Sequence, residues 1–262
     1  MSHTFITRQV KSLLRLTRFV VLFTCAPFAA YAQLVSSFSD VTYWVGSGTN
    51  ESVLVIDWND GKNPASLVWG YRWDYDTNGD APTGMDMLKD VALDDPRLIT
   101  ALLFADTFVF GIGYDTDGDG SSFTIGSPGV GTETGSASHP IDRYKEGFFE
   151  NGYWSYYLYG GNITYTIYDS SFNPIGVGNY NQTGTTSYAV ASSDWWSSQV
   201  GAADRRLVPN SWDVWNWAPN FIPGTIDQPV AAIPEPSAWA LILLAAAGLI
   251  AIRRGCQTLR QT

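Results

Sequence analysis

The chain is poor in the residues that build thiol, redox or histidine-based metal chemistry. Its 262 residues include only two cysteines and two histidines. Cys25 lies in an N-terminal apolar segment and Cys256 in the C-terminal tail, so the region between them has no disulfide and no cysteine ligand or nucleophile. With His3 near the N-terminus, His139 stands alone in a Gly/Ser-rich segment, where we expect it to be exposed and without function. Zinc sites built on several histidines are therefore excluded.

The short motifs of common enzymes are also missing. The chain has no Gly-x-Ser-x-Gly elbow, no His-Glu-x-x-His pair and no phosphate-binding loop. Two carboxylates can hydrolyse a glycosidic bond without any of these, but the many scattered acids single out no pair. We therefore assign no catalytic residue, and a secreted carbohydrate-active hydrolase remains an alternative.

Long apolar runs occur only at the two ends of the chain. Residues 19–29 form an apolar core before a small-x-small site, Ala30 to Ala32. Four basic residues precede this core: Arg8, Lys11, Arg15 and Arg18. This order is typical of a secretory signal peptide, so residues 1–32 are expected to form a signal helix that is removed.

The C-terminal apolar run, residues 238–252, is flanked by a proline-rich motif and an arginine pair. These flanking residues are Pro234, Glu235, Pro236, Arg253 and Arg254. The prolines keep the motif extended, and the run is shorter than the roughly 20 apolar residues of a full span. The arginines predict a transmembrane helix with a cytoplasmic tail, residues 255–262, and with the bulk of the chain on the outer side.

Residues 233–254 together resemble the PEP-CTERM sorting signal of Gram-negative bacteria, whose substrates are processed by the membrane enzyme exosortase. Such tails usually stop sooner after the basic pair than this one does. The resemblance implies export across the inner membrane by the secretion machinery, handling by exosortase and transient anchoring by the C-terminal helix. It also implies association with the extracellular polysaccharide of a biofilm matrix at the cell surface. A plain single-pass anchor is the alternative.

Between the two signals, residues 33–232 are expected to form a single secreted domain that is strongly acidic. Of the 15 basic residues, four lie in the signal peptide and three in the tail, and of the 25 acidic residues only Glu235 lies outside the domain. The domain therefore carries a formal charge of −16. Because this charge repels phosphate backbones, nucleic acid is excluded as a partner.

The pattern of the domain predicts a mainly β fold with antiparallel, sandwich-like sheets. The strands are expected at residues 42–45, 53–58, 67–73, 107–114, 121–125, 153–159, 162–168 and 187–190. Residues 153–168 read as a hairpin around Gly160 and Gly161. A small helical insert is expected near 84–104. It comprises a first helix capped by Thr83 and a second that begins at Asp95-Pro96 and runs through Leu103. Residues 193–227 read as coil.

Two acidic segments carry the ligand pattern of a calcium loop. Both have acidic or amide side chains at positions one, three and five and glycine at position six: Asp115, Asp117 and Asp119 before Gly120, and Asp74, Asp76 and Asn78 before Gly79. They resemble the front of an EF-hand loop, but neither has the acid at position twelve. A ligand from elsewhere, such as Glu133, would have to complete the site. Calcium binding and a plain solvated turn both remain open.

Aromatic residues are the other candidate for binding. Trp69, Tyr71 and Trp73 are expected on one face of a strand, with Arg72 on the other. Most tryptophans are expected in the core, whereas Trp212, Trp215 and Trp217 read as partly exposed rings that could stack on a ligand, because they fall in predicted coil.

The sequence thus indicates an exported surface or matrix protein. It favours a non-enzymatic binding or structural module over an enzyme, and the module depends on calcium if the acidic loops bind it. Residues 43–74 also resemble, loosely, part of an uncharacterised domain of secreted bacterial surface proteins, which implies no activity. A secreted hydrolase and a capture protein for a planar nutrient are the alternatives.

Overall fold

The computed structural model describes residues 33–159, 162–171, 173–181, 187–188, 195–198 and 200–234. The predicted signal helix with Ala30 and Ala32 lies outside these residues, and so does the C-terminal helix. Of the sorting motif and its arginine pair, only Pro234 is described, while Glu235, Pro236, Arg253 and Arg254 are not. The helices in the described part of the chain are all too short or too polar to span a membrane.

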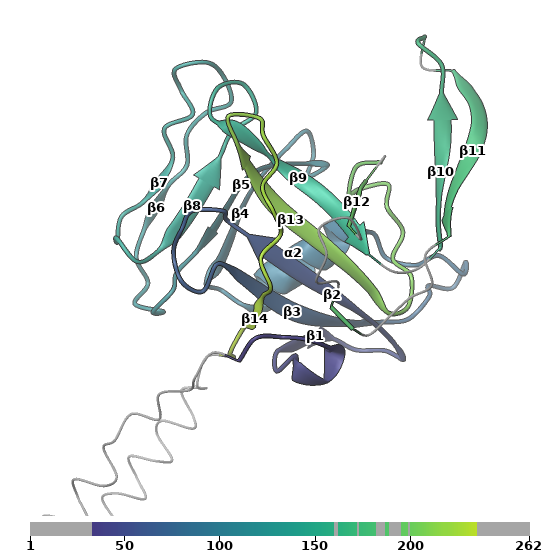
Figure 1. Ribbon diagram of the computed structural model, residues 1–262, viewed down its shortest axis with the longest axis horizontal. Helices are drawn as coiled ribbons and strands as arrows, with labels where there is room; N and C mark the ends of the chain where they lie inside the picture. The colour runs from purple at the N-terminus through teal and green to yellow at the C-terminus, as the bar shows by residue number, and fades with distance from the viewer. Residues whose placement is uncertain are drawn as a thin grey trace, which may run out of the picture. The chain divides into compact units, whose positions relative to one another are not determined.

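A mixed sheet of seven described strands lies at the centre of the domain (Figure 1). The order is β1-β3-β2-β13-β9-β12, and β14 also pairs with β3. The bounds are β1 Trp44–Gly46, β2 Asn50–Asp57, β3 Ser66–Trp73, β9 Gly152–Tyr159, β12 Trp196–Ser197, β13 Ser211–Pro219 and β14 Val230–Ala231. The mainly β prediction is confirmed. The prediction of antiparallel sheets is confirmed only in part for this sheet. Strand β2 pairs antiparallel with β3, and β9 pairs antiparallel with β13 and β12, whereas β1 with β3, β13 with β2, and β14 with β3 pair in parallel.

Both faces of the large sheet are covered by apolar side chains. Along β3, Trp69, Tyr71 and Trp73 face one core cluster, as their spacing predicts, while Val68 faces the other. The first cluster also contains the apolar side of the helix α2, Gly84–Asp94. Because both faces are buried, the central strands β2 and β13 are apolar or aromatic over most of their length and lack a simple inside–outside alternation.

Two smaller sheets and a hairpin complete the described elements. In the three-stranded sheet, β5 (Phe108–Tyr114) lies between β4 (Leu98–Leu103) and β8 (Arg143–Glu146). Strands β6 (Phe123–Thr124) and β7 (Ser136–Ala137) form a short pair, and β10 (Asn162–Tyr168) pairs with β11 (Pro174–Asn181). A short 3-10 helix, η1 (Phe38–Asp40), precedes the large sheet.

The helical insert is confirmed in its first half and wrong in its second. Thr83 caps α2 as expected, and its hydroxyl accepts a hydrogen bond from the amide of Asp86 at 3.0 Å. The expected second helix is instead the strand β4. Its apolar residues have helical spacing, but antiparallel pairing with β5 satisfies its backbone, and this tertiary pairing overrides the local pattern.

The predicted hairpin of residues 153–168 is also wrong. Both segments are strands, but β9 pairs with β13 and β12, while β10 pairs with β11. The partners of β9 come from the far end of the chain, and a local turn signal carries no information about them. Of the strand expected at residues 187–190, Ser187 forms an isolated bridge with Ser37, and residues 189–190 lie outside the described part.

The tryptophans placed in coil lie in a buried strand, so this prediction is wrong as well. Trp212, Trp215 and Trp217 belong to β13 and are 0%, 5% and 3% exposed. Because successive side chains of a strand point to opposite faces, Trp212 packs in one core cluster and the other two pack in the opposite cluster. They form neither a single patch nor a platform for a ligand.

The two ends of the described domain meet at one edge of the large sheet. The amide of Val35 donates to the carbonyl of Pro229 at 2.8 Å, and β14 pairs with β3 just before the chain leaves the domain. Ala232 is still buried, and Ile233, the next residue, is 48% exposed. The start of the proposed sorting motif is therefore accessible next to the point where the mature chain is expected to begin.

Candidate functional site

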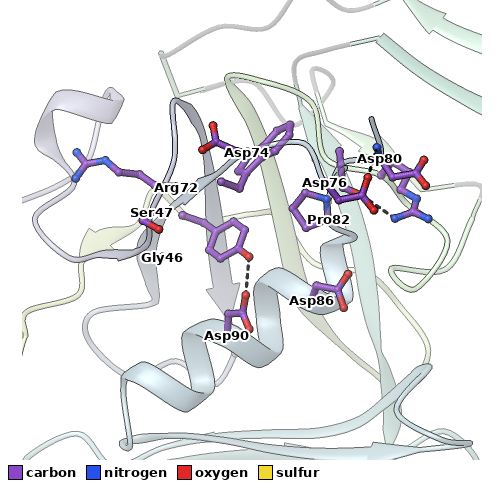
Figure 2. A pocket seen from close by; sticks show the side chains of 13 residues that line it. Gly46, Ser47, Arg72, Asp74, Asp76, Asp80, Pro82, Asp86 and Asp90 are labelled. Carbon is purple, nitrogen blue, oxygen red and sulfur yellow. Dashed lines mark hydrogen bonds between the residues drawn. The ribbon is translucent and has the colours of Figure 1, made fainter. Parts of the chain in front are cut away.

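An open acidic pocket lies between β3, α2 and the segment that joins them. Its volume is about 480 Å³. It is lined by Gly46, Ser47, Tyr71, Arg72, Trp73, Asp74, Asp76, Asp80, Ala81, Pro82, Asp86, Asp90 and Arg206. Figure 2 shows Asp86 and Asp90 projecting from the helix on one side, with Asp74, Asp76 and Asp80 on the opposite side.

The helical wall presents two carboxylates one turn apart. Asp86 and Asp90 share a face of α2 because residues four apart on a helix are neighbours. Asp86 completes the cap of the helix, since its carboxylate accepts the amide of Thr83 at 2.9 Å. Asp90 accepts a hydrogen bond from the hydroxyl of Tyr71 at 2.5 Å, which connects this wall to β3. Both carboxylates are thus fixed in position and still exposed.

On the opposite wall, backbone amides hold the carboxylates in their ionised form. The amide and hydroxyl of Thr49 donate to Asp74 and lower its pKa. The amides of Asp80 and Asn78 likewise lower the pKa of Asp76. An ionised carboxylate only accepts hydrogen bonds. This wall therefore suits ligands that bring donors, such as hydroxyl or ammonium groups.

Two arginines line the pocket, but both are engaged by the protein. Arg72 pairs with Glu51 at 3.1 Å, lies over the ring of Trp44 at 4.7 Å, and points away from the two aspartates of the helix (Figure 2). Arg206 donates to the carbonyl of Ala81 at 2.8 Å. Five aspartates against these two cations leave the pocket negative, so it disfavours anionic ligands.

The second acidic loop predicted from sequence lies in the wall of this pocket. Asp74 and Asp76 line it, while the side chain of Asn78 bonds back to Asp76 at 3.4 Å. Within the described residues, Asp74 and Asp76 belong to no group of three His, Cys, Asp or Glu side chains whose ligand atoms converge. The loop therefore contributes to the wall of the pocket, and calcium binding by its side chains stays a prediction.

The first acidic loop does gather its three carboxylates. Asp115, Asp117 and Asp119 each place an oxygen within 4.8 Å of the other two. Asp115 is buried and accepts the amides of Gly118 and Gly120 at 2.8 and 2.9 Å, which closes the loop around it. Calcium binding stays a prediction for this loop.

Glu133 is not the additional calcium ligand that the sequence suggested. Its two carboxylate oxygens accept four backbone amides, those of residues 148–151, at 2.7 to 3.0 Å. Burial alone would raise the pKa of Glu133, but these amides together hold it below its usual range. This carboxylate anchors a turn.

Several lining residues of the pocket were not identified from the sequence. Asp80, Asp86, Asp90 and Arg206 come from three separate segments, and only the pair on α2 gave a local signal, two acids four residues apart on the polar face of the predicted helix. Comparison of the chain with protein-family models, curated proteins and solved structures found no match.

Proposed function

We propose that this protein is an exported, non-enzymatic binding protein that holds a neutral or amine-bearing extracellular polysaccharide in the acidic pocket. Export rests on the two terminal signals of the sequence, with exosortase and the secretion machinery as the partners that process them. The observation that carries the binding role is the arrangement of five exposed or partly exposed aspartates around one cavity. Sugar hydroxyls and ammonium groups supply the donors that these acceptors need.

The structure favours binding over hydrolysis for this pocket. A glycosidase needs a carboxylic acid that stays protonated near neutral pH, which requires a raised pKa. The pKa values of Asp74 and Asp76 are lowered instead. Asp57 is the described carboxyl whose pKa is raised, and it is fully buried in β2, away from the lining of the pocket. A nutrient-capture role loses its main support because Trp212, Trp215 and Trp217 are buried.

Calorimetric titration of the mature protein with defined polysaccharides tests this proposal. A neutral glucan and an amine-bearing glucosamine oligomer should bind, whereas a uronic acid polymer should not. Asp80→Asn and Asp90→Asn should each weaken binding about tenfold or more, because each removes a charge-assisted acceptor. Asp94→Asn is the matched control, since Asp94 ends the same helix outside the pocket. Equal binding by all four proteins, or tight binding of the anionic polymer, would overturn the proposal.

A further inference from the structure

Two loops beyond the ends of β5 and β8 bring together side chains that are far apart in the sequence. The antiparallel pairing of these strands places Tyr114 opposite Arg143. The acidic loop that follows β5 therefore lies beside the segment that precedes β8. Hydrogen bonds join the two segments, because the amide and hydroxyl of Thr116 donate to the Asp142 carboxylate at 2.9 Å and to the carbonyl of Ile141 at 3.0 Å.

Asp117, His139 and Asp142 converge where these loops meet. One ligand atom of each lies within 4.8 Å of the other two. His139 comes from the Gly/Ser-rich segment and is half-buried, which corrects the expectation that it is exposed. A nitrogen ligand next to two carboxylates is a donor set different from the three carboxylates of the acidic loop.

Two buried polar atoms of this cluster have no hydrogen-bond partner among the described residues. Asp142 is 1% exposed, yet among the described residues nothing donates to its Oδ2, and the buried Nδ1 of His139 has no partner there either. Buried polar atoms are rarely left unpaired, because doing so costs their desolvation free energy. The ammonium of Lys62 lies nearby, but it donates to the backbone carbonyls of Pro140 and Asp142. The carboxylate oxygen therefore still lacks a partner.

We propose that Asp117, His139 and Asp142 bind a divalent transition metal ion of the zinc type. Imidazole is a good ligand for zinc, cobalt and nickel, whereas calcium takes six to eight oxygen ligands. Three protein ligands from one histidine and two carboxylates match the number that zinc takes when water fills its remaining position. The ion satisfies both orphaned atoms and joins the two loops. This site is separate from the acidic pocket and does not depend on its ligand.

The test is calorimetric titration of the purified, chelator-treated protein with Zn²⁺, supported by the visible absorption of bound Co²⁺. One ion should bind per chain, and millimolar Ca²⁺ should not displace it. His139→Gln and Asp117→Asn should each weaken Zn²⁺ binding about tenfold or more. The control Asp119→Asn removes a charge next to the proposed site from a residue that is not one of its ligands. This control should weaken Zn²⁺ binding less than about fivefold.

Three results would overturn the proposal. The first is that neither Zn²⁺ nor Co²⁺ binds stoichiometrically. The second is that a folded His139→Gln protein binds Zn²⁺ as tightly as the wild type. The third is that Asp119→Asn weakens Zn²⁺ binding more than His139→Gln does. The last would assign the ion to the oxygen-only group of Asp115, Asp117 and Asp119. Circular dichroism shows whether each variant is folded. Because Asp117 is exposed, Asp117→Asn keeps the test valid even if His139→Gln disturbs its loop.

Discussion

Replacing Glu133 by glutamine should destabilise the domain strongly, although the change removes a single charge. The two oxygens of Glu133 each accept two backbone amides from the turn of residues 148–151. Glutamine puts an NH₂ group in place of one oxygen, so two amides face a donor and lose their acceptor. A hydrogen bond to a charged group contributes about 1.5–3 kcal/mol. Because the turn can relax and recover part of these hydrogen bonds, we expect the free energy of unfolding to fall by about 3 kcal/mol or more.

Denaturant unfolding measures this cost as a shift of the midpoint at constant slope. Glu51→Gln is the matched control, because Glu51 forms an exposed pair with Arg72, with side-chain exposures of 37% and 43%. An exposed pair contributes about 1 kcal/mol or less. A Glu133→Gln protein as stable as this control would refute the role of Glu133 as the acceptor that anchors the turn.

The same variant has a defined pH dependence. Because the pKa of Glu133 is lowered in the folded state, its contribution to stability is present above the unfolded value, near 4.3, and is lost as the pH falls through the folded value. The difference in unfolding free energy between wild type and Glu133→Gln should therefore narrow below about pH 4. A difference that stays constant from pH 7 to pH 3 would contradict this account.

Three further perturbations test the core of the fold. Burial raises the pKa of Asp57 to about 6. The contribution of Asp57 to the free energy of unfolding is therefore greatest below its unfolded pKa, near 4, and falls as the pH rises to 6. Over this range pH-dependent unfolding should show that the wild type loses up to roughly 3 kcal/mol of stability and that Asp57→Asn does not. Trp212→Ala should lower the free energy of unfolding by about 3–5 kcal/mol without weakening polysaccharide binding. A variant that is as stable as the wild type but no longer binds polysaccharide would show that this ring contacts the ligand. Thr83→Ala should cost about 1 kcal/mol through loss of the helix cap, and no change in the midpoint would show that the cap is dispensable.

Much of the local structure followed from the sequence because its causes are local. The cap at Thr83 and the shared face of Trp69 and Tyr71 depend on neighbours within a few residues. The strand β13 could not be found in this way. It contains Asp213 and Asn216, which read as surface residues, yet both are fully buried. Their partners come from other parts of the chain.

Asp213 shows why this strand was missed. It pairs with the buried guanidinium of Arg205 at 3.5 Å and accepts a hydrogen bond from the hydroxyl of Tyr156. Asn216 donates to Asp57, 159 positions earlier in the chain, at 3.2 Å. A polar residue can be buried once such partners are in place, but nothing within a local window reveals them. The acidic pocket was only partly predicted for the same reason, since its walls join three separated segments.

The proposed function requires that the acidic pocket reach the outside of the cell, and mass spectrometry of the protein recovered from its own host tests this most directly. The account predicts a polypeptide in the surface or extracellular fraction that begins at Gln33 and has lost the residues beyond the Pro234–Pro236 motif. An intact chain from Met1 to Thr262, found in the cytosol alone, would contradict it.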